Sequence, residues 1–270
     1  MDYLARESAD LSVELWNRID DAVIGTARKH LTCRRFLKLF GPLGPGATSV
    51  AVDGVAKEEV LEDGIGRIVG RTRLELPMFY EDFTLLGRDL ERASQTGIAL
   101  DLAPAVTAAK KSARREDDLV LNGNKALGVD GLLTVKGSSK IKRGDWAQGE
   151  NGFADVAAAV AQLAKTGYLG RYALVVSPDL YLDLQRLQPN TGMLEIDRVQ
   201  KLIGDNVHMT SVMGAGKAVL VCAEPEYLDL AVGLDLSVGY LELADFNHGF
   251  RIMETLALRV KDPAAIVVFG

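Results

Sequence analysis

The sequence predicts an α+β fold, and three patterns support this prediction. Near the N-terminus, apolar residues recur at intervals of four, which places them on one face of a helix. Between residues 48 and 76 the period changes to two, as in a strand with one exposed face. Two uninterrupted apolar runs, Tyr172–Val176 and Ala218–Cys222, are typical of buried strands. One chain therefore combines helices, strands with one exposed face and fully buried strands.

Composition limits the classes of function. The chain has 270 residues, of which 48% are hydrophobic and 25% charged, and its formal net charge is -6. This is ordinary for a globular protein, and the negative charge argues against a protein that coats nucleic acid. No stretch reaches the roughly 18 apolar residues of a membrane helix, and the first residues lack the layout of a signal peptide. We therefore expect a cytoplasmic protein with neither a membrane nor a nucleic acid as its partner.

The first predicted element is an amphipathic helix that begins near Leu11 and has Ser12 as its N-cap. A loop rich in glycine and proline, 41–46, ends this segment. The end of the segment also holds a basic patch, which could meet an acidic partner or could be a solvated helix face. The apolar stripe of the helix is Leu15, Ile19, Val23, Ala27 and Leu31, and the basic patch is Arg28, Lys29, Arg34, Arg35 and Lys38.

A long hairpin arm follows over residues 48–76. Ile68, Thr72, Leu74 and Leu76 lie on one side of its second strand, and an acidic segment, 57–64, supplies the tip. The arm carries few large apolar groups, and an isolated two-stranded hairpin is marginal in water. It therefore has to be held by the body of this chain or by a neighbouring subunit.

Further helices and strands are expected between residue 104 and the C-terminus. A second long helix is predicted over 104–121, and its three acidic residues, Glu116, Asp117 and Asp118, are expected on a solvated face. Ser177 and Pro178 together mark a helix start. The remaining predicted elements are helices over 153–165 and 194–203 and alternating strands over 227–260, followed by an apolar end, 264–269, tied into a sheet.

None of the motifs for catalysis, metal binding or phosphate binding is complete. Gly214 to Lys217 resembles the end of a phosphate-binding loop but lacks its first glycine and its Ser or Thr. The three histidines are scattered, and there is no G-x-S-x-G elbow. Cys33 and Cys222 suit buried, reduced thiols. We therefore expect no catalytic residue, no metal site and no cofactor.

The order of elements and a series of short motifs resemble the encapsulins, which are nanocompartment shell proteins of bacteria and archaea. The resemblance covers essentially the whole chain. The motifs, in chain order, are Trp16-Asn-Arg-Ile-Asp20, Arg34-Arg-Phe36, Gly41-Pro-Leu-Gly44, Glu116-Asp117 with Gly131-Leu132, Tyr172-Ala-Leu-Val-Val-Ser177, Asp235-Leu-Ser-Val-Gly-Tyr240 and Glu254-Thr255.

This resemblance implies the fold of tailed-bacteriophage major capsid proteins, with a peripheral domain, an axial domain and an extended E-loop. The implied domains are the N-terminal helix and hinge of the peripheral domain (1–47), the E-loop (48–81), the spine helix of the peripheral domain (82–126), the axial domain (127–226) and returning strands of the peripheral domain (227–270). The resemblance also implies that Ile68, Thr72, Leu74 and Leu76 become buried only between subunits.

The function implied is that of a structural subunit, and not an enzyme, of an icosahedral shell with about 60 copies or a multiple. A cargo protein would carry a short C-terminal targeting peptide, which apolar groups would anchor while Arg34 donates hydrogen bonds to it. Lys38 departs from the acidic residue that some relatives have. The residues implied in this cargo-peptide site, which ordinary core and salt-bridge roles also explain, are Leu31, Arg34, Lys38, Asp235, Leu236, Ser237 and Val238.

Two finer expectations concern cofactors and cargo. Some relatives bind a flavin at a tryptophan shortly after the E-loop, but residues 83–89 contain none, so no flavin is expected there. The segments 76–83, 190–196 and 247–250 resemble shells that enclose an iron-mineralising, ferritin-like cargo. If so, Asp205, Asn206 and His208 would line a pore that admits iron, or form a plain surface loop. The alternative to a nanocompartment is a prophage major capsid protein.

Overall fold

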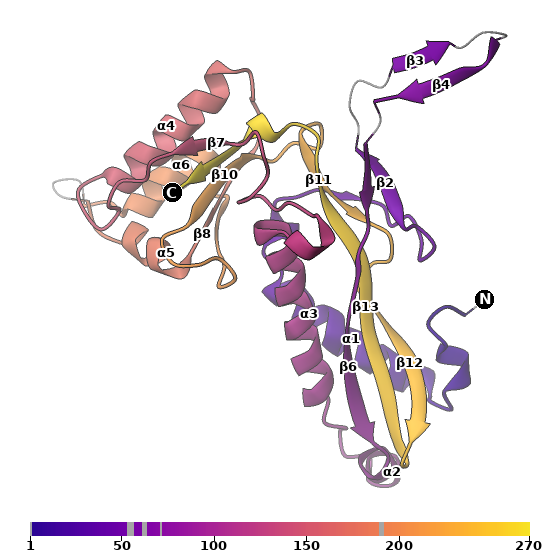
Figure 1. The fold of residues 1–270 in the computed structure, drawn as a ribbon. Coiled ribbons are helices and arrows are strands. Elements are labelled where there is room, and N and C mark those ends of the chain that lie inside the picture. The colour runs from indigo at the N-terminus through magenta and orange to yellow at the C-terminus, as the bar shows by residue number, and fades with distance from the viewer. Residues whose placement is uncertain (1, 53–56, 61–63, 71, 189–191) are drawn as a thin grey trace.

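Two five-stranded sheets and a separate hairpin arm organise the chain (Figure 1). The computed structural model describes residues 2–52, 57–60, 64–70, 72–188 and 192–270. One sheet, with the helices beside it, forms the elongated peripheral domain. The other sheet forms the axial domain, and the arm extends away from both (Figure 1).

The peripheral domain is built around β13 (Asn247–Val260), which has 14 residues. Antiparallel neighbours flank it on either side: β6 (Met78–Leu86) on one, and β12 (Ser237–Ala244) and β11 (Leu228–Val232) on the other, with β1 (Leu39–Phe40) parallel to β11 at the edge. Two long helices, α1 (Val13–His30) and α3 (Ala103–Asn122), pack against each other and against these strands. Trp16, Ile19, Val23, Phe83 and Phe250 form the core between them.

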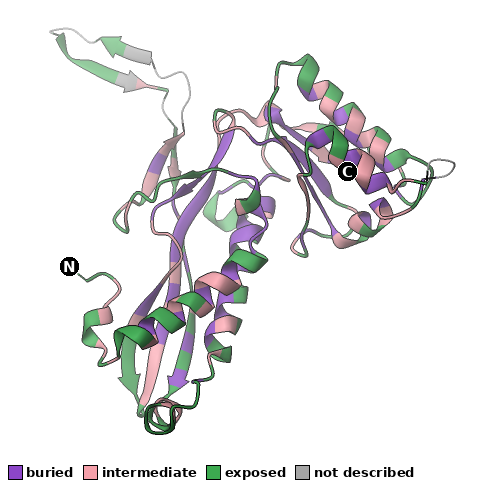
Figure 2. Ribbon diagram, turned by 180° about the vertical axis from the view of Figure 1, so that it is seen from behind, coloured by how far each residue is buried: buried purple, intermediate pink, exposed green. Residues whose placement is uncertain are grey.

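The axial domain has the strand order β7-β14-β10-β8-β9. Every residue of its central strand β10 is buried, as the purple ribbon of Figure 2 shows. Its strands are β7 (Ser139–Ile141), β8 (Tyr172–Val176), β9 (Val207–Met209), β10 (Ala218–Cys222) and β14 (Ile266–Phe269), and its helices are α4 (Asn151–Lys165), α5 (Pro178–Leu184) and α6 (Glu195–Ile203).

The helices begin and end where local chemistry favours it. The Ser12 hydroxyl accepts a hydrogen bond from the Leu15 N–H, as expected of an N-cap. Gly204 ends α6 in the left-handed conformation that glycine tolerates. The predicted buried strands are confirmed as β8 and β10, and the predicted long helices as α1 and α3. Short 3-10 helices cover Arg6–Ser8, Cys33–Arg35, Lys125–Leu127 and Pro263–Ala265.

The arm has a root and an outer part. Strands β2 (Ser49–Val52) and β5 (Thr72–Glu75) form the root, and β3 (Lys57–Val60) and β4 (Gly66–Val69) form the outer hairpin. Contrary to expectation, Leu76 is already buried within one chain, at 6% exposure, because it packs on Val50, Ala231 and Ala257. Leu74 is half-buried against the same cluster and Thr72 is exposed, whereas the side chain of Ile68 lies outside the described residues.

A buried ion pair fastens the root of the arm. Arg259 on β13 binds the Asp229 carboxylate with its Nε and Nη2 at 2.8 and 2.6 Å, and its Nη1 donates to the Ala51 carbonyl at 3.1 Å. In the outer part, the Arg67 Nε lies 2.7 Å from an oxygen of Glu59, and both side chains are exposed. The root therefore belongs to the body of the subunit, while the outer hairpin does not.

Two boundaries differ from those expected, and one helix was not predicted. The last strand, β14, was expected in the peripheral domain but pairs with β10 and β7 of the axial sheet, because the turn at 261–265 carries the chain across. The E-loop range 48–81 overlaps β6, which is paired with β13 from Met78 onward. A helix that the sequence reading did not identify, α2 (Gly87–Thr96), follows β6 at the tip of the peripheral domain.

Candidate functional site

A cavity of 370 Å³ opens where α1 ends. Leu31, the C-cap residue of α1, forms part of its wall, and Leu236, just before β12, faces it from the peripheral sheet. Leu31 and Leu236 also pack with Ala27 and Ala113, which gives the cavity an apolar floor. Its lining consists of Ile24, Ala27, Arg28, Leu31, Arg34, Arg35, Leu39, Asp235 and Leu236.

Arg34 closes one end of this cavity and is held by three carboxylates. Its Nε lies 2.8 Å from Glu116 on α3, its Nη1 2.6 Å from Asp235, and its Nη2 3.0 Å from Glu254 on β13. Glu116 and Glu254 are fully buried, and Asp235 is half-exposed. In the subunit alone, the Nε, Nη1 and Nη2 atoms of Arg34 each donate to a carboxylate of the same chain.

The position of Arg34 is set by the turn that follows α1. The Asp117 carboxylate accepts hydrogen bonds from the Thr32 and Cys33 N–H groups at 2.8 and 2.9 Å, which fixes this turn against α3. The expectation of a solvated acidic face on α3 was wrong for Glu116 and Asp117, which are buried. The spacing of these acidic residues along the helix does not show that their partners, Thr32, Cys33 and Arg34, come from a distant part of the chain.

Three carboxylates around one guanidinium leave an excess of negative charge in a buried space. Burial raises the pKa of Glu254 well above its ordinary value, and the neighbouring Glu116 raises it further. Burial also raises the pKa of Glu116, although the charge of Arg34 opposes this. Burial thus favours the neutral form of both carboxyl groups, and the charge of Arg34 favours the ionised form.

The other expected cargo-peptide residues lie away from the cavity. Val238 is buried in the core beside Trp16 and Phe250. The Ser237 hydroxyl donates to the Asp235 carbonyl at 2.7 Å, and Lys38 is exposed while its carbonyl accepts from the Leu230 N–H. The structure thus brings together Leu31, Arg34, Asp235 and Leu236 in the wall of the cavity, whereas Lys38, Ser237 and Val238 do not line it.

The sequence reading missed several residues of the cavity. Ile24, Ala27 and Arg28 lie seven, four and three positions before Leu31, which is the spacing of one helix face, so helical periodicity could have identified them. Leu39 follows the turn and gave no such signal. Within the basic patch, Arg34 is paired with three carboxylates, whereas Lys29 lines a second cavity of 470 Å³ with Lys110 and Arg114. Arg35 lines both cavities.

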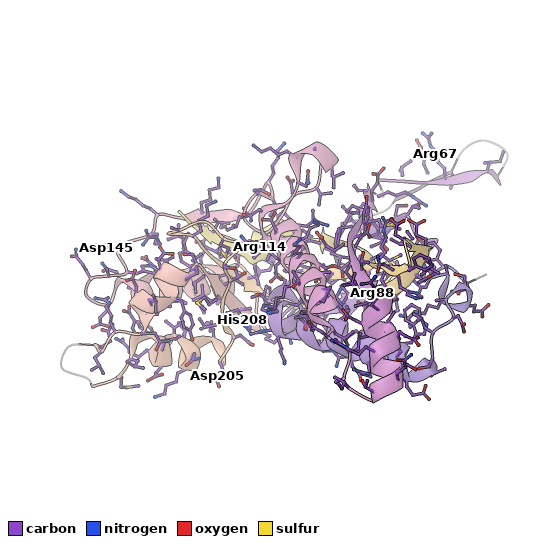
Figure 3. The ribbon with its side chains drawn as sticks, turned by 90° about the horizontal axis from the view of Figure 1, so that it is seen from below. Arg67, Arg88, Arg114, Asp145, Asp205 and His208 are labelled. Atoms are coloured by element: carbon purple, nitrogen blue, oxygen red, sulfur yellow. The ribbon has the colours of Figure 1, made fainter. Side chains whose placement is uncertain are left out.

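The three expected pore residues lie in different environments. Asp205 is exposed with a φ of 61° in the turn after α6, and the Asn206 carbonyl accepts from the Leu174 N–H. His208 instead points into the subunit, where its ring stacks on Phe36 with centroids 5.5 Å apart. Burial, with a contribution from the charge of Arg35, lowers the pKa of His208 to about 4. Figure 3 shows Asp205 and His208, with His208 nearer the centre of the molecule.

Within the described residues, no group of three or more His, Cys, Asp or Glu side chains is arranged to hold a metal ion. Cys33 and Cys222 are buried free thiols, and burial raises the pKa of both. None of the helices in the described part of the chain is long and apolar enough to cross a membrane.

Comparison with known proteins gives one consistent result. The family described as "Encapsulating protein for peroxidase" matches residues 1–257. The type 1 encapsulin shell protein of Myxococcus xanthus is 36% identical over 98% of this chain and 95% of the relative. A diheme-cytochrome–encapsulin shell fusion protein of Kuenenia stuttgartiensis is 38% identical over 97% of this chain and 75% of the relative.

Solved structures agree on the fold. The virus-like particle of Pyrococcus furiosus superimposes with a TM-score of 0.78 and 22% identity, covering 96% of this chain and 100% of that one. The capsid of the Myoviridae phage XM1 gives 0.65 and 17% over 88% and 91%. The expected capsid-protein fold is confirmed. The match over nearly the whole sequence, together with this fold, places the chain in the encapsulin shell-protein family.

Proposed function

We propose that this chain is the structural subunit of an icosahedral shell of about 60 copies or a multiple, which encloses a cargo protein in the cytoplasm. The observation that carries the proposal is the family match over residues 1–257. The outer hairpin, which the rest of the subunit does not cover, supports it. Size-exclusion chromatography and electron microscopy test it. Purified protein that stays monomeric or forms only small oligomers would contradict it.

A prophage major capsid protein is the alternative, and its support is confined to the fold. The capsid of phage XM1 shares 17% identity with this chain, whereas shell proteins of the encapsulin family reach 36–38%. Analysis of the particle contents separates the two. Packaged nucleic acid favours the capsid, and a copurifying protein favours the nanocompartment.

The cavity at the end of α1 is the proposed docking site for the C-terminal targeting peptide of the cargo. Its apolar floor, formed by Leu31 and Leu236, suits the aliphatic side chains of an extended peptide. Arg34 shapes the end of the cavity by holding Asp235 in place, rather than by binding the peptide. Peptide recognition therefore depends on apolar contacts, with Arg28 at the exposed rim.

Cargo loading tests this docking site. A fluorescent protein that ends in the targeting peptide of a cargo gene is co-expressed with the shell, and the ratio of cargo to shell is measured in purified particles. Ile24 lines the cavity without belonging to the core, so Ile24→Asp should abolish loading while particles still form. Val13→Asp, at the exposed start of the same helix, is the matched control. Equal loading of both variants would place the docking site elsewhere.

For the cargo we propose the ferritin-like, iron-mineralising class, in iron storage or protection against oxidative stress. Its support is a ferritin-like–encapsulin shell fusion protein of Pyrococcus furiosus, which is 24% identical over 77% of this chain. In this proposal exposed Asp205 lines a pore, while His208 does not reach it because it stacks on Phe36. Mass spectrometry of native particles identifies the cargo class directly, and an iron-free cargo would exclude it.

A further inference from the structure

The hairpin turn between β12 and β13 adopts a backbone conformation that its sequence does not favour. Ala244 pairs with Asn247, so Asp245 and Phe246 form a two-residue loop. Both have positive φ angles, 49° and 62°. Loops of this kind favour Asn-Gly or Asp-Gly, because a side chain in the left-handed region costs free energy. Asp245 fits the first position, but Phe246 stands where glycine is favoured.

Packing within the subunit does not explain the phenylalanine either. Its side chain is 88% exposed, the largest value among the large apolar residues that are exposed in the described part of the chain. A bulky apolar side chain that is held in a strained conformation and left in water points to a function outside the subunit.

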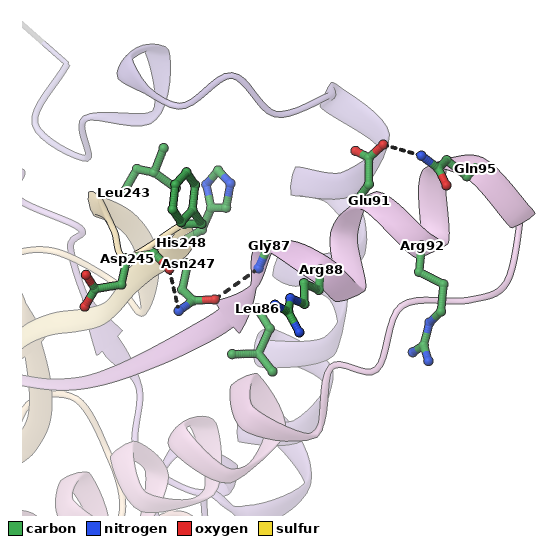
Figure 4. A pocket seen from close by; sticks show the side chains of 11 residues that line it. Leu86, Gly87, Arg88, Glu91, Arg92, Gln95, Leu243, Asp245, Asn247 and His248 are labelled. Carbon is green, nitrogen blue, oxygen red and sulfur yellow. Dashed lines mark hydrogen bonds between the residues drawn. The ribbon is translucent and has the colours of Figure 1, made fainter.

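The backbone of this turn is fixed against α2. A Cβ atom at Gly87 would lie 2.0 Å from the Phe246 carbonyl oxygen, so only glycine permits the observed contact. The Asn247 side chain accepts a hydrogen bond from the Gly87 N–H at 3.3 Å and donates one to the Asp245 carbonyl at 3.1 Å (Figure 4). The turn therefore presents the side chain of Phe246 from a supported position.

An open cavity of 890 Å³ lies beside the same turn. Leu86 and Leu243 form its apolar part and are themselves 53% and 58% exposed. Arg88 and Arg92 on α2 line it as well, and their side chains are seen in Figure 4. A guanidinium and apolar groups together suit an aromatic ring, and elsewhere in this chain the Arg251 guanidinium lies 3.8 Å from the centre of the Tyr80 ring.

We propose that Phe246 of one subunit inserts into the cavity between α2 and the β12–β13 turn of a second copy of this chain. The cavity is lined by charges of both signs, Arg88 and Arg92 with Glu91 and Asp245, and by Phe246 itself. Arg92 is paired with Asp89, so Arg88 is the guanidinium that can meet Asp245 of the second copy. Among the described residues, neither Asp245 nor Arg88 has an ion-pair partner. Because the ring and the cavity lie on the same tip, copies related by a symmetry axis can exchange this contact.

This inference rests on the shell assembly proposed above, and Phe246→Gly tests it in shells produced without cargo. Glycine removes both the ring and the strain of the turn, so the subunit should fold as well as the wild type, with unchanged circular dichroism. The particles should dissociate at a clearly lower urea concentration, followed by light scattering. Phe246→Trp, which keeps an aromatic ring, is the matched control. Equal dissociation midpoints for Phe246→Gly and the wild type would overturn the proposal.

The Phe246→Trp variant also reports burial directly. Trp16 and Trp146 are 8% and 0% exposed, so the wild-type signal can be subtracted with little error. In intact empty particles, acrylamide should quench the added tryptophan several-fold less than it does in the unfolded chain. Quenching equal to that in the unfolded chain would show that the ring stays in water and would overturn the contact.

A charge exchange tests the identity of the partner. Arg88→Glu and Asp245→Lys should each weaken the particles, and the double variant should recover much of the loss because the ion pair is restored with reversed signs. Losses that simply add would contradict a contact between copies. Wild-type protein that forms no particles would instead refute the shell function itself, so the two failures are distinguishable.

Discussion

The axial sheet and the arm are both β-structure, but they are stabilised differently. The five residues of β10 are buried between two neighbouring strands and covered by the axial helices, so this sheet has a core of its own. The outer arm is a two-stranded hairpin whose Val60 is 73% exposed. The root of the arm lies between these cases, because Leu76 and Val50 pack on β11 and β13. The axial sheet and the root of the arm therefore have apolar cores within the subunit, whereas the outer arm has none among its described residues.

Leu220→Ala is expected to have the largest effect on the stability of the subunit. Leu220 is fully buried at the centre of β10, and removing its side chain leaves a cavity that costs about 2–5 kcal/mol. Urea unfolding followed by the fluorescence of Trp146, which lies in the same core, measures this loss. A loss below about 0.5 kcal/mol would mean that the axial sheet is not self-sufficient.

Leu76→Ala distinguishes the root of the arm from its outer part. We expect a loss near the lower end of the same range, about 2 kcal/mol, because Leu76 is buried in a smaller cluster. The same urea titration on subunits measures it, with the exposed neighbour Thr72→Ala as the control. If both substitutions change the free energy of unfolding equally little, the root would belong to the inter-subunit arm, as expected from the sequence.

His208 gives the edge of the axial sheet a pH dependence. Its folded pKa of about 4 lies below its ordinary value, so the unfolded chain takes up the proton first as the pH falls. Stability is complete above about pH 6.5 and is lost as the pH falls toward 4. His208→Gln should lose less stability over this window in thermal unfolding. Parallel curves for both proteins would refute the assignment.

Val60→Asp should have the smallest effect on the subunit, within about 0.5 kcal/mol, because the side chain is exposed. Its effect on assembly should nevertheless be severe, since a carboxylate would have to be buried against a neighbour. Urea unfolding of subunits and electron microscopy of particles measure the two quantities separately. Normal particles would show that the outer arm makes no apolar contact at this residue.

Much of the fold could be predicted from the sequence where one pattern determines one element. The spacing of Ile19 and Val23 identified α1, and the apolar run at β10 identified a buried strand. The motif order also led to the family. The α2 helix was missed because it has no buried residue, and the crossing of β14 into the axial sheet depends on pairing that periodicity does not encode.

The candidate site could be predicted only in part, for a related reason. Leu31 lies on a helix stripe and is visible in the sequence, but the partners of Arg34 come from residues 82, 201 and 220 positions away. No local pattern distinguishes Glu116, which is buried, from Asp118, which is exposed two positions later. Leu76 was misjudged similarly, since contacts with distant residues bury it. The stacking of His208 on Phe36 also joins residues that lie far apart in the sequence.

The bond from Arg259 to the Ala51 carbonyl bears on how one chain could build shells of different diameter. A change in curvature requires a pivot between the arm and the body of the subunit. Arg259 and its partner Asp229 are buried together, and the bond to Ala51 holds β2 to β13. If the proposed shell changes its curvature, β2 therefore stays with the body of the subunit, because this bond holds Ala51 to Arg259 on β13.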